Sequence, residues 1–501
     1  MSDYNKAPEE LVEWNIKIEK IAREVGLDFF PVFFEVVDWK EMNMIAAYGG
    51  FPNRYPHWSF GMQYQELSKS YAYGLSKIYE MVINNNPCYA YLLHSNHLVD
   101  QKLVMAHVYG HCDFFKNNVY FSHTNRKMMD EMANHKIRVR RYIDQQGHDE
   151  VERFLDVCLS IENLIDNHGP FIKRRAEQEG RVLQEGEEAQ PLVKKMKSKG
   201  YMDKFINPKE FLESEKKKIK KSQEQEREFP ESPVRDVLLF LLEHAPMERW
   251  KRDILAMIRD EAYYFLPQMQ TKIMNEGWAS YWHSTLMTRR IMNSSEFIDY
   301  ADHHSGTVAS NGRLNPYKLG IELFRDIEDR WNKGRFGKEY EECDNMVEKK
   351  RWDKKTGIGK QKIFEVRKLY NDLTFIDTFL TEDFCRENKM FAFDYNKANN
   401  TYQITSTDFK KVKDKLLAQL TNSGRPMLSV VNGNYKNRSE LYLKHQYEGF
   451  ELKIDWLKEV LKNLHQIWTR PVYVETKFED HEHVFGFDGK EHKDFRKEAQ
   501  V

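Results

Sequence analysis

Apolar residues recur at helical spacing through most of the first 370 positions. Between residues 8 and 25 they return every three or four positions, which places them on one face of an α-helix: Leu11, Trp14, Ile18, Ile21 and Val25. The same kind of pattern predicts helices near residues 65–83, 97–115, 125–145, 149–167, 233–265 and 268–293. A short apolar run over residues 88–93 predicts a strand. We therefore expect residues 1–370 to form a mainly helical N-terminal domain.

The pattern changes near residue 372. Residues 390–395 and 401–405 alternate between apolar and polar side chains, as strands do. Further strand-like stretches cover residues 426–433, 440–446 and 472–476, with helical patterns over 408–421 and 455–464. The sequence thus predicts a smaller C-terminal α+β domain over residues 371–501.

A highly charged stretch interrupts the helical part. Residues 173–231 are dense in Lys, Glu, Gln and Arg and contain few apolar side chains. Such a composition buries too little apolar surface to offset the entropy of ordering the chain. We expect this stretch to be a solvated insertion or a partly disordered linker.

Composition excludes several classes of protein. The chain has 501 residues, of which 41% are hydrophobic, so a sizeable core can form. The formal net charge of −1 argues against a nucleic-acid binder that relies on bulk charge. No run of eighteen apolar residues predicts a membrane span, and the first residues do not resemble a signal peptide. The five cysteines are scattered without a C-x-x-C pair, which is typical of a cytoplasmic protein with reduced thiols.

Two predicted helices carry metal-ligand side chains on one face each. His107 and His111 lie four residues apart, so their imidazoles stack one turn apart. Glu276 and His283 lie seven residues apart, which corresponds to two turns of the other helix. If the two helices face each other, these four residues can ligate one metal ion, zinc first, with iron or manganese as alternatives.

The third ligand has two candidates. Glu131 lies twenty residues after His111, a spacing familiar from glutamate-ligated zinc peptidases. Glu276 lies in a Glu-Gly-Trp-Ala-x-Tyr segment similar to one that ligates zinc in some of those peptidases, and we favour it. Glu131 and His135 then remain as residues that orient the ligands, as ligands of a second iron or manganese ion, or as members of a buried ion-pair network with Arg138 or Arg140.

The general base of a hydrolase is not in its usual place. The His107–His111 segment resembles the HExGH segment of metallopeptidases, but Val108 stands where those enzymes have the glutamate. A valine cannot take a proton. Asp113, Glu131 and His283 are the candidates for this catalytic role.

Two further segments are weaker candidates for the site. Residues 54–61 combine an arginine with several aromatic residues, which suits either the wall of a substrate cleft or an aromatic plug over the core. His303 and His304 precede a Ser-Gly pair at a predicted helix end, from which they could approach the metal.

Four segments together resemble the stage V sporulation protein R (SpoVR) family along nearly the whole chain. They are Arg54-Tyr55-Pro56-His57-Trp58-Ser59-Phe60-Gly61, the stretch from Ala106 to Asn118, the stretch from Met274 to His283, and Asn315-Pro316-Tyr317-Lys318-Leu319-Gly320. The resemblance implies a role in forming the spore cortex, a peptidoglycan layer, from the cytoplasm of the mother cell. It also implies partners among cortex-synthesis or cortex-processing proteins, or in a serine protein kinase system.

The resemblance does not fix a reaction, so two functions stay open. The first is a metal-dependent hydrolase with a helical core like that of the zinc peptidases. The second is a non-catalytic interaction or regulatory protein, in which the peptidase-like core has lost its base.

Overall fold

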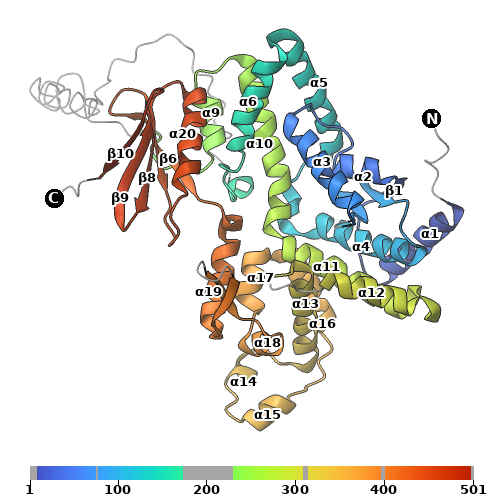
Figure 1. Cartoon of the computed structure of the whole chain (residues 1–501). Coiled ribbons are helices and arrows are strands. Elements are labelled where there is room, and N and C mark those ends of the chain that lie inside the picture. Colours follow the sequence, from blue (N-terminus) through green and yellow to red (C-terminus); the bar gives the residue numbers. More distant parts are fainter. Residues whose placement is uncertain (1–7, 75–76, 173–228, 309–313, 397–400, 498–501) are drawn as a thin grey trace, which may run out of the picture. The chain divides into compact units, whose positions relative to one another are not determined.

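The computed structural model describes residues 8–74, 77–172, 229–308, 314–396 and 401–497 (Figure 1). Most of the predicted charged insertion, residues 173–228, lies outside the described residues. The chain divides into two compact units. Unit 1 comprises Met1–Leu155 and Asp260–Arg425, and unit 2 comprises Asp156–Arg259 and Pro426–Val501.

Unit 1 is mainly helical, as predicted. Its N-terminal segment contains α1 (Glu9–Glu24), α2 (Trp39–Ala47), α3 (Trp58–Ala72), α4 (Leu98–Asn117) and α5 (Met128–Gln146). Its second segment contains α11 (Lys272–Leu286), α12 (Phe297–Val308), α13 (Pro316–Lys333), α14 (Lys338–Glu341), α15 (Met346–Arg351), α16 (Gly359–Leu369), α17 (Asp372–Phe379), α18 (Glu382–Glu387) and α19 (Phe409–Leu420). Two more helices have residues in both units: α6 (His148–Ser160) and α10 (Arg249–Gln270).

The two helices that carry the candidate metal ligands, α4 and α11, lie in the centre of the unit 1 core. Every residue of α4 from Gln101 to Phe115 is buried, and so is nearly every residue of α11 from Ile273 to Ser284. A helix that is covered on all sides has little amphipathic pattern, because no face needs to be polar. An ionisable side chain that is buried on these stretches is withdrawn from water and needs a partner.

Unit 1 also contains two small sheets. β1 (Val32–Val37), β3 (Cys88–Leu93) and β2 (Glu80–Ile83) form one sheet in that spatial order, with β1 parallel and β2 antiparallel to β3. β4 (Ala392–Asn396) and β5 (Thr401–Ser406) form an antiparallel pair. The strand predicted over residues 88–93 is confirmed. The helix predicted near 65–83 is present as α3 up to Ala72, but its second half is wrong, because β2 follows there.

Residues 371–425 belong to unit 1, which differs from the domain boundary predicted at 370/371. The carboxylate of Asp372 accepts hydrogen bonds from the backbone N–H groups of Ile273 and Met274, at 2.8 and 2.9 Å, at the start of α11. Phe375 and Ile376 of the same helix α17 are fully buried in the unit 1 core. The change from helical to strand-like pattern near residue 372 therefore does not coincide with a change of compact unit.

Unit 2 is the smaller α+β part. Its sheet has the strand order β10-β9-β8-β7-β6: β6 (Leu428–Tyr435), β7 (Glu440–His445), β8 (Val472–Phe478), β9 (His481–Phe487) and β10 (His492–Arg496). β7 and β8 pair in parallel, and α20 (Ile454–Trp468) makes the crossover between them. α9 (Val237–His244) also belongs to unit 2, and its Phe240 stacks on Trp468 of α20 at 5.7 Å between ring centroids.

The single helix predicted over residues 233–265 is divided in two. α9 ends at His244 and α10 begins at Arg249, so Pro246 lies between them. A proline disfavours helical geometry in the residue before it, which explains the break. In the part of the chain that the structure describes, no helix combines the length and the apolar character needed to cross a bilayer.

Candidate metal centre

His107, His111 and Glu276 form one cluster, in which the two histidines are buried and Glu276 is partly buried. The Nε2 atoms of His107 and His111 lie 3.6 and 3.5 Å from Oε2 of Glu276. One ligand atom from each of the three residues can be chosen so that all three atoms lie within 4.8 Å of one another. The two helices that were predicted to carry the ligands thus meet in space, and three of the four predicted side chains are directed at a common point.

A contact between two small residues brings the helices together. A Cβ atom placed on Gly110 of α4 would lie 2.7 Å from the Cα atom of Ala279 in α11, so only glycine fits. In the same way, Gly277 of α11 lies against Gly320 of α13, where a Cβ atom would come within 2.4 Å of the Gly320 Cα atom. Gly110 adjoins His111 and Gly277 adjoins Glu276, so backbone packing directly sets the positions of both candidate ligands.

Neighbouring side chains orient the two imidazoles. The Nδ1 atom of His111 lies 2.9 Å from Oδ1 of Asn275, and because an amide oxygen only accepts, His111 donates its Nδ1–H. Nε2 of His111 then carries the free lone pair. The Nδ1 atom of His107 lies 2.9 Å from Nδ1 of His283, which likewise leaves Nε2 of His107 directed at Glu276. Such partners on the far nitrogen are typical of metal-ligating histidines.

The charges of the cluster suit a cation. Burial would raise the pKa of Glu276, but its polar contacts with His107, His111 and Tyr317 more than offset burial, so the pKa is lowered and the carboxylate stays ionised. Burial, together with the neighbouring His107, lowers the pKa of His111 to about 4, so this imidazole is neutral at pH 7. Oε2 of Glu276 is buried and has no hydrogen-bond partner. Unpaired buried carboxylate oxygens are costly, and a positive ion between the three groups would remove that cost.

His283 is close to the cluster but lies behind His107. Its Nδ1 atom contacts Nδ1 of His107, on the side of that imidazole away from Glu276. This position suits a residue that holds His107 in one tautomer. Its predicted roles as fourth ligand or acid–base group stay predictions.

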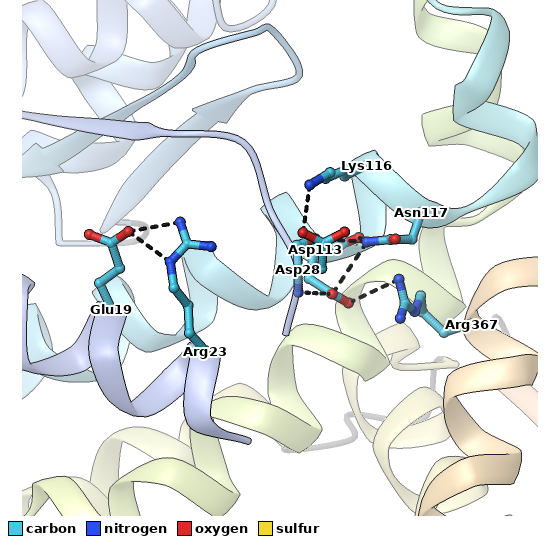
Figure 2. A network of polar contacts seen from close by, with 7 residues as sticks. All are labelled: Glu19, Arg23, Asp28, Asp113, Lys116, Asn117 and Arg367. Atoms are coloured by element: carbon cyan, nitrogen blue, oxygen red, sulfur yellow. Dashed lines mark hydrogen bonds and ion pairs between the residues drawn. The ribbon is translucent and has the colours of Figure 1, made fainter. Parts of the chain in front are cut away.

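Asp113 belongs to a different polar network, which Figure 2 shows. Its carboxylate accepts hydrogen bonds from the backbone N–H of Asp28 and the Nε1–H of Trp278, both at 2.8 Å, and lies 3.5 Å from Nη1 of Arg367. Burial raises its pKa to about 6 even though Arg367 and the hydrogen bonds act in the opposite direction. Two residues along a helix correspond to a rotation of about 200°, so Asp113 and His111 point to opposite sides of α4.

Glu131 and His135 do not join the cluster of His107, His111 and Glu276. His135 lies on a second buried cluster, where its Nδ1 atom is 2.9 Å from Oε1 of Glu261 in α10. The other oxygen of Glu261 accepts hydrogen bonds from Nη2 of Arg54, at 2.7 Å, and from the hydroxyl of Tyr55, at 3.3 Å. The ion-pair network expected for His135 thus exists, but its members come from residues 54–55 and from α10.

The cluster around Glu261 explains part of the aromatic loop over residues 54–61. Tyr55 is fully buried, and the guanidinium of Arg54 lies 4.5 Å from the ring centroid of Phe60. Charge interaction with Glu261 more than offsets the burial of Arg54, so its pKa is raised and the group stays charged. These contacts favour the plug over the cleft wall as the role of this half of the loop. The side chains of His303 and His304 lie outside the described residues.

Sequence reasoning missed three residues that complete the two clusters. Asn275 precedes Glu276, Tyr317 lies in the Asn-Pro-Tyr segment at the start of α13, and Glu261 lies within α10. The ring of Tyr317 stacks near that of His107, with 6.3 Å between centroids. A signal existed for two of them, since Asn275 and Tyr317 fall within the segments that carry the family resemblance.

A helical unit in which two buried histidines and a partly buried glutamate converge defines a class of candidate metalloproteins. Comparison with known families is more specific: the SpoVR like protein family matches residues 5–425, and the SpoVR-like C-terminal domain matches residues 426–479. The chain therefore belongs to the SpoVR family, as its motifs predicted. The border between the two matched regions coincides with the border between Arg425 and Pro426 that separates unit 1 from unit 2.

The chain is also similar to a curated bacterial protein. The relative is the "Uncharacterized protein YcgB" of Escherichia coli (strain K12), which is 29% identical over 497 residues. The match covers 93% of this chain and 91% of the relative. No solved structure matches the chain. Membership of the SpoVR family indicates a sporulation-related protein.

Proposed function

We propose that the protein is a metal-dependent hydrolase of the peptidase type, and that it acts on peptidoglycan during formation of the spore cortex. Its ligands are His107, His111 and Glu276. The observation that carries the proposal is the buried Oε2 of Glu276, which has no hydrogen-bond partner and faces two imidazole nitrogens.

The separation of the ligand atoms fits a divalent metal ion. Zinc binds histidine nitrogen and carboxylate oxygen at roughly 2.0–2.2 Å with tetrahedral angles, which places neighbouring ligand atoms about 3.4 Å apart. The two Nε2–Oε2 separations of 3.5 and 3.6 Å are close to this value. Two histidines and one glutamate would leave the fourth coordination position of a zinc ion open. A substrate carbonyl group could bind at that position, and the zinc ion would act on it as a Lewis acid. Iron or manganese is the alternative.

The surrounding residues support the ligands in this proposal. Asn275 and His283 hold the two imidazoles through their Nδ1 atoms, and Tyr317 hydrogen bonds with Glu276. We assign His283 to positioning His107. A peptidase-like helical core, of the kind that the His107–His111 segment resembles, is part of the same proposal.

A second candidate function follows from the missing base. Val108 is buried at the position of the peptidase glutamate, and the carboxylate of Asp113 is occupied by Asp28, Trp278 and Arg367. These observations favour a non-catalytic protein in which the metal serves structure, and which acts by binding cortex-synthesis or cortex-processing proteins or a serine-kinase stress system. On either function we place the protein in the cytoplasm of the mother cell.

Metal content tests the shared part of both functions. Protein purified without chelator and without a polyhistidine tag is analysed for zinc, iron and manganese, beside His111→Ala and Glu276→Gln. We expect about one metal ion per chain in the wild type and loss of it in both variants. His135→Ala is the matched control, because it also removes a buried histidine from unit 1 but leaves the cluster of His107, His111 and Glu276 intact. Equal metal content in all four proteins would refute the proposed ligands.

Hydrolysis and spore phenotype then separate the two functions. The metal-loaded protein is incubated with peptidoglycan peptides, and each variant replaces the wild-type gene in a spore former. A hydrolase predicts cleavage that Glu276→Gln abolishes, together with spores that have a defective cortex. Normal cortex with Glu276→Gln, and no cleavage by the wild type, would favour the non-catalytic protein.

A further inference from the structure

A cavity in unit 1 lies between α11, α12 and α13, and none of the three metal-ligand candidates lines it. Its volume is about 610 Å³, within the range of pockets that hold small molecules. Side chains of α11 and the turn that follows it form one wall, Phe297 and Tyr300 of α12 form another, and Arg325 and Glu328 of α13 form a third.

Two arginines give this cavity a positive side. Arg325 is held at the cavity wall by a hydrogen bond from its Nη2 atom to Oγ of Ser284, at 3.2 Å, while its Nη1 atom contacts Glu322 at 2.9 Å. Arg289 lines the cavity from the turn after α11. Guanidinium groups bind phosphate through two parallel hydrogen bonds, so a pair of them on one cavity favours a phosphorylated ligand.

The remaining polar groups of the wall are arranged as acceptors. Ser284 and Thr285 donate their hydroxyl protons to the backbone carbonyl of Tyr281, and Thr288 donates to that of Ser284. The hydroxyl oxygens of Thr285 and Thr288 thus keep lone pairs for donors on a ligand, whereas Oγ of Ser284 already accepts a hydrogen bond from Arg325. Glu328 accepts a hydrogen bond from the hydroxyl of Tyr281 at 2.6 Å and adds a further acceptor.

The aromatic wall adds a flat apolar surface. Tyr300 is buried, whereas the side chain of Phe297 is 56% exposed although it lines the cavity. An exposed aromatic ring on a cavity that is also lined by two arginines offers a stacking surface for a planar ring. The combination of guanidinium groups, hydroxyl acceptors and aromatic rings matches the three parts of a nucleotide: phosphate, sugar hydroxyls and base.

We propose that the cavity lined by Arg289, Arg325 and Phe297 binds a nucleoside phosphate, with both guanidinium groups on the phosphate. The inference is independent of the metal centre, because no residue of the cluster of His107, His111 and Glu276 lines this cavity. It gives the protein a small-molecule binding site on the same helix, α11, that carries Glu276.

Titration calorimetry of the full chain with AMP tests the proposal. We expect saturable binding of AMP, weaker binding of inorganic phosphate, and no binding of adenosine. Arg289→Gln and Arg325→Gln should each weaken AMP binding about tenfold or more, because each loses a charge-assisted hydrogen bond. Arg290→Gln is the matched control. Arg290 directly follows Arg289 in the chain, but it pairs with Glu24 and does not line the cavity.

The outcomes are distinguishable from failure of the metal proposal. Metal content should stay at the wild-type value in all three arginine variants, whatever their affinity for AMP. The proposal is overturned if AMP does not bind, if adenosine binds as tightly as AMP, or if Arg290→Gln weakens binding as much as the other two. Circular dichroism melting of each variant confirms that a loss of binding is not a loss of fold.

Discussion

Replacing Gly110 by alanine separates two helices without touching a ligand. The new Cβ atom would lie 2.7 Å from the Cα atom and 3.3 Å from the Cβ atom of Ala279. Since ordinary van der Waals contact begins near 3.4 Å, α4 and α11 must move apart by about 3.4 − 2.7 = 0.7 Å. The obstructing atom belongs to the backbone, so no side-chain rotation relieves the clash.

This displacement is large for a metal site and moderate for stability. Metal–ligand distances hold within about 0.2 Å, so a shift of 0.7 Å between the histidines and Glu276 removes one ligand from reach. We expect metal affinity to fall by about tenfold or more. Overpacking costs about 1–3 kcal/mol, and the better helix propensity of alanine offsets about 1 kcal/mol of it. The net loss of unfolding free energy is then about 0–2 kcal/mol.

Metal titration and denaturant unfolding measure the two effects, with Gly61→Ala as the control. Gly61 lies within α3, and an added Cβ atom there meets no atom within 4 Å. This control should stabilise the protein by about 0.5–1 kcal/mol and leave metal affinity unchanged. The reasoning is refuted if Gly110→Ala binds metal as tightly as the wild type and is as stable as Gly61→Ala.

Three further predictions concern the buried polar groups. Asn275→Ala removes the acceptor for the Nδ1–H of His111, so metal affinity measured by chelator competition should fall about 10–100-fold with little change in fold; an unchanged affinity would show that Asn275 does not orient the ligand. Glu261→Ala leaves the charge of Arg54 buried without its carboxylate, and unfolding in urea should show a loss of about 3–5 kcal/mol, whereas a loss below 1 kcal/mol would contradict the ion pair as described. Burial raises the pKa of Asp372 from 3.8 to about 7, so between these pH values the folded state keeps a proton that the unfolded state loses. The contribution of Asp372 to the free energy of unfolding is therefore complete below pH 3.8 and declines as the pH rises to about 7. The unfolding free energy of Asp372→Asn should therefore fall less between pH 5 and pH 8 than that of the wild type, and parallel pH profiles would contradict this.

Prediction from sequence was most successful where the signal was local. The helices that became α1, α4, α5 and α11 and the strand over residues 88–93 were expected from apolar spacing and are present. The expectation that His107 and His111 share one helical face also holds, because four residues make about one turn. Prediction was less successful near residues 65–83 and 233–265, where a strand and a proline interrupt patterns that look helical.

For the candidate site too, features that depend on local spacing were predicted, whereas contacts between distant segments were only hypotheses or were missed. That His107, His111 and Glu276 meet was a hypothesis at the sequence level, since nothing local states that two helices more than 160 residues apart are neighbours. Asp113 looked available as a base beside the histidines, yet its carboxylate faces Asp28, Trp278 and Arg367. The direction of a side chain on a helix is local information, but its surroundings are supplied by other elements.

The sequence by itself determined which residues share a helix, which face of it they occupy, and to which family the chain belongs. Each of these depends on spacing along the chain or on the identity of contiguous segments. The tertiary structure decided which faces meet: Gly110 against Ala279, Asn275 on His111, and Glu261 of α10 on His135. These contacts depend on close packing of a shared core, where a fit of a few tenths of an ångström between distant segments leaves no periodic signal in the sequence.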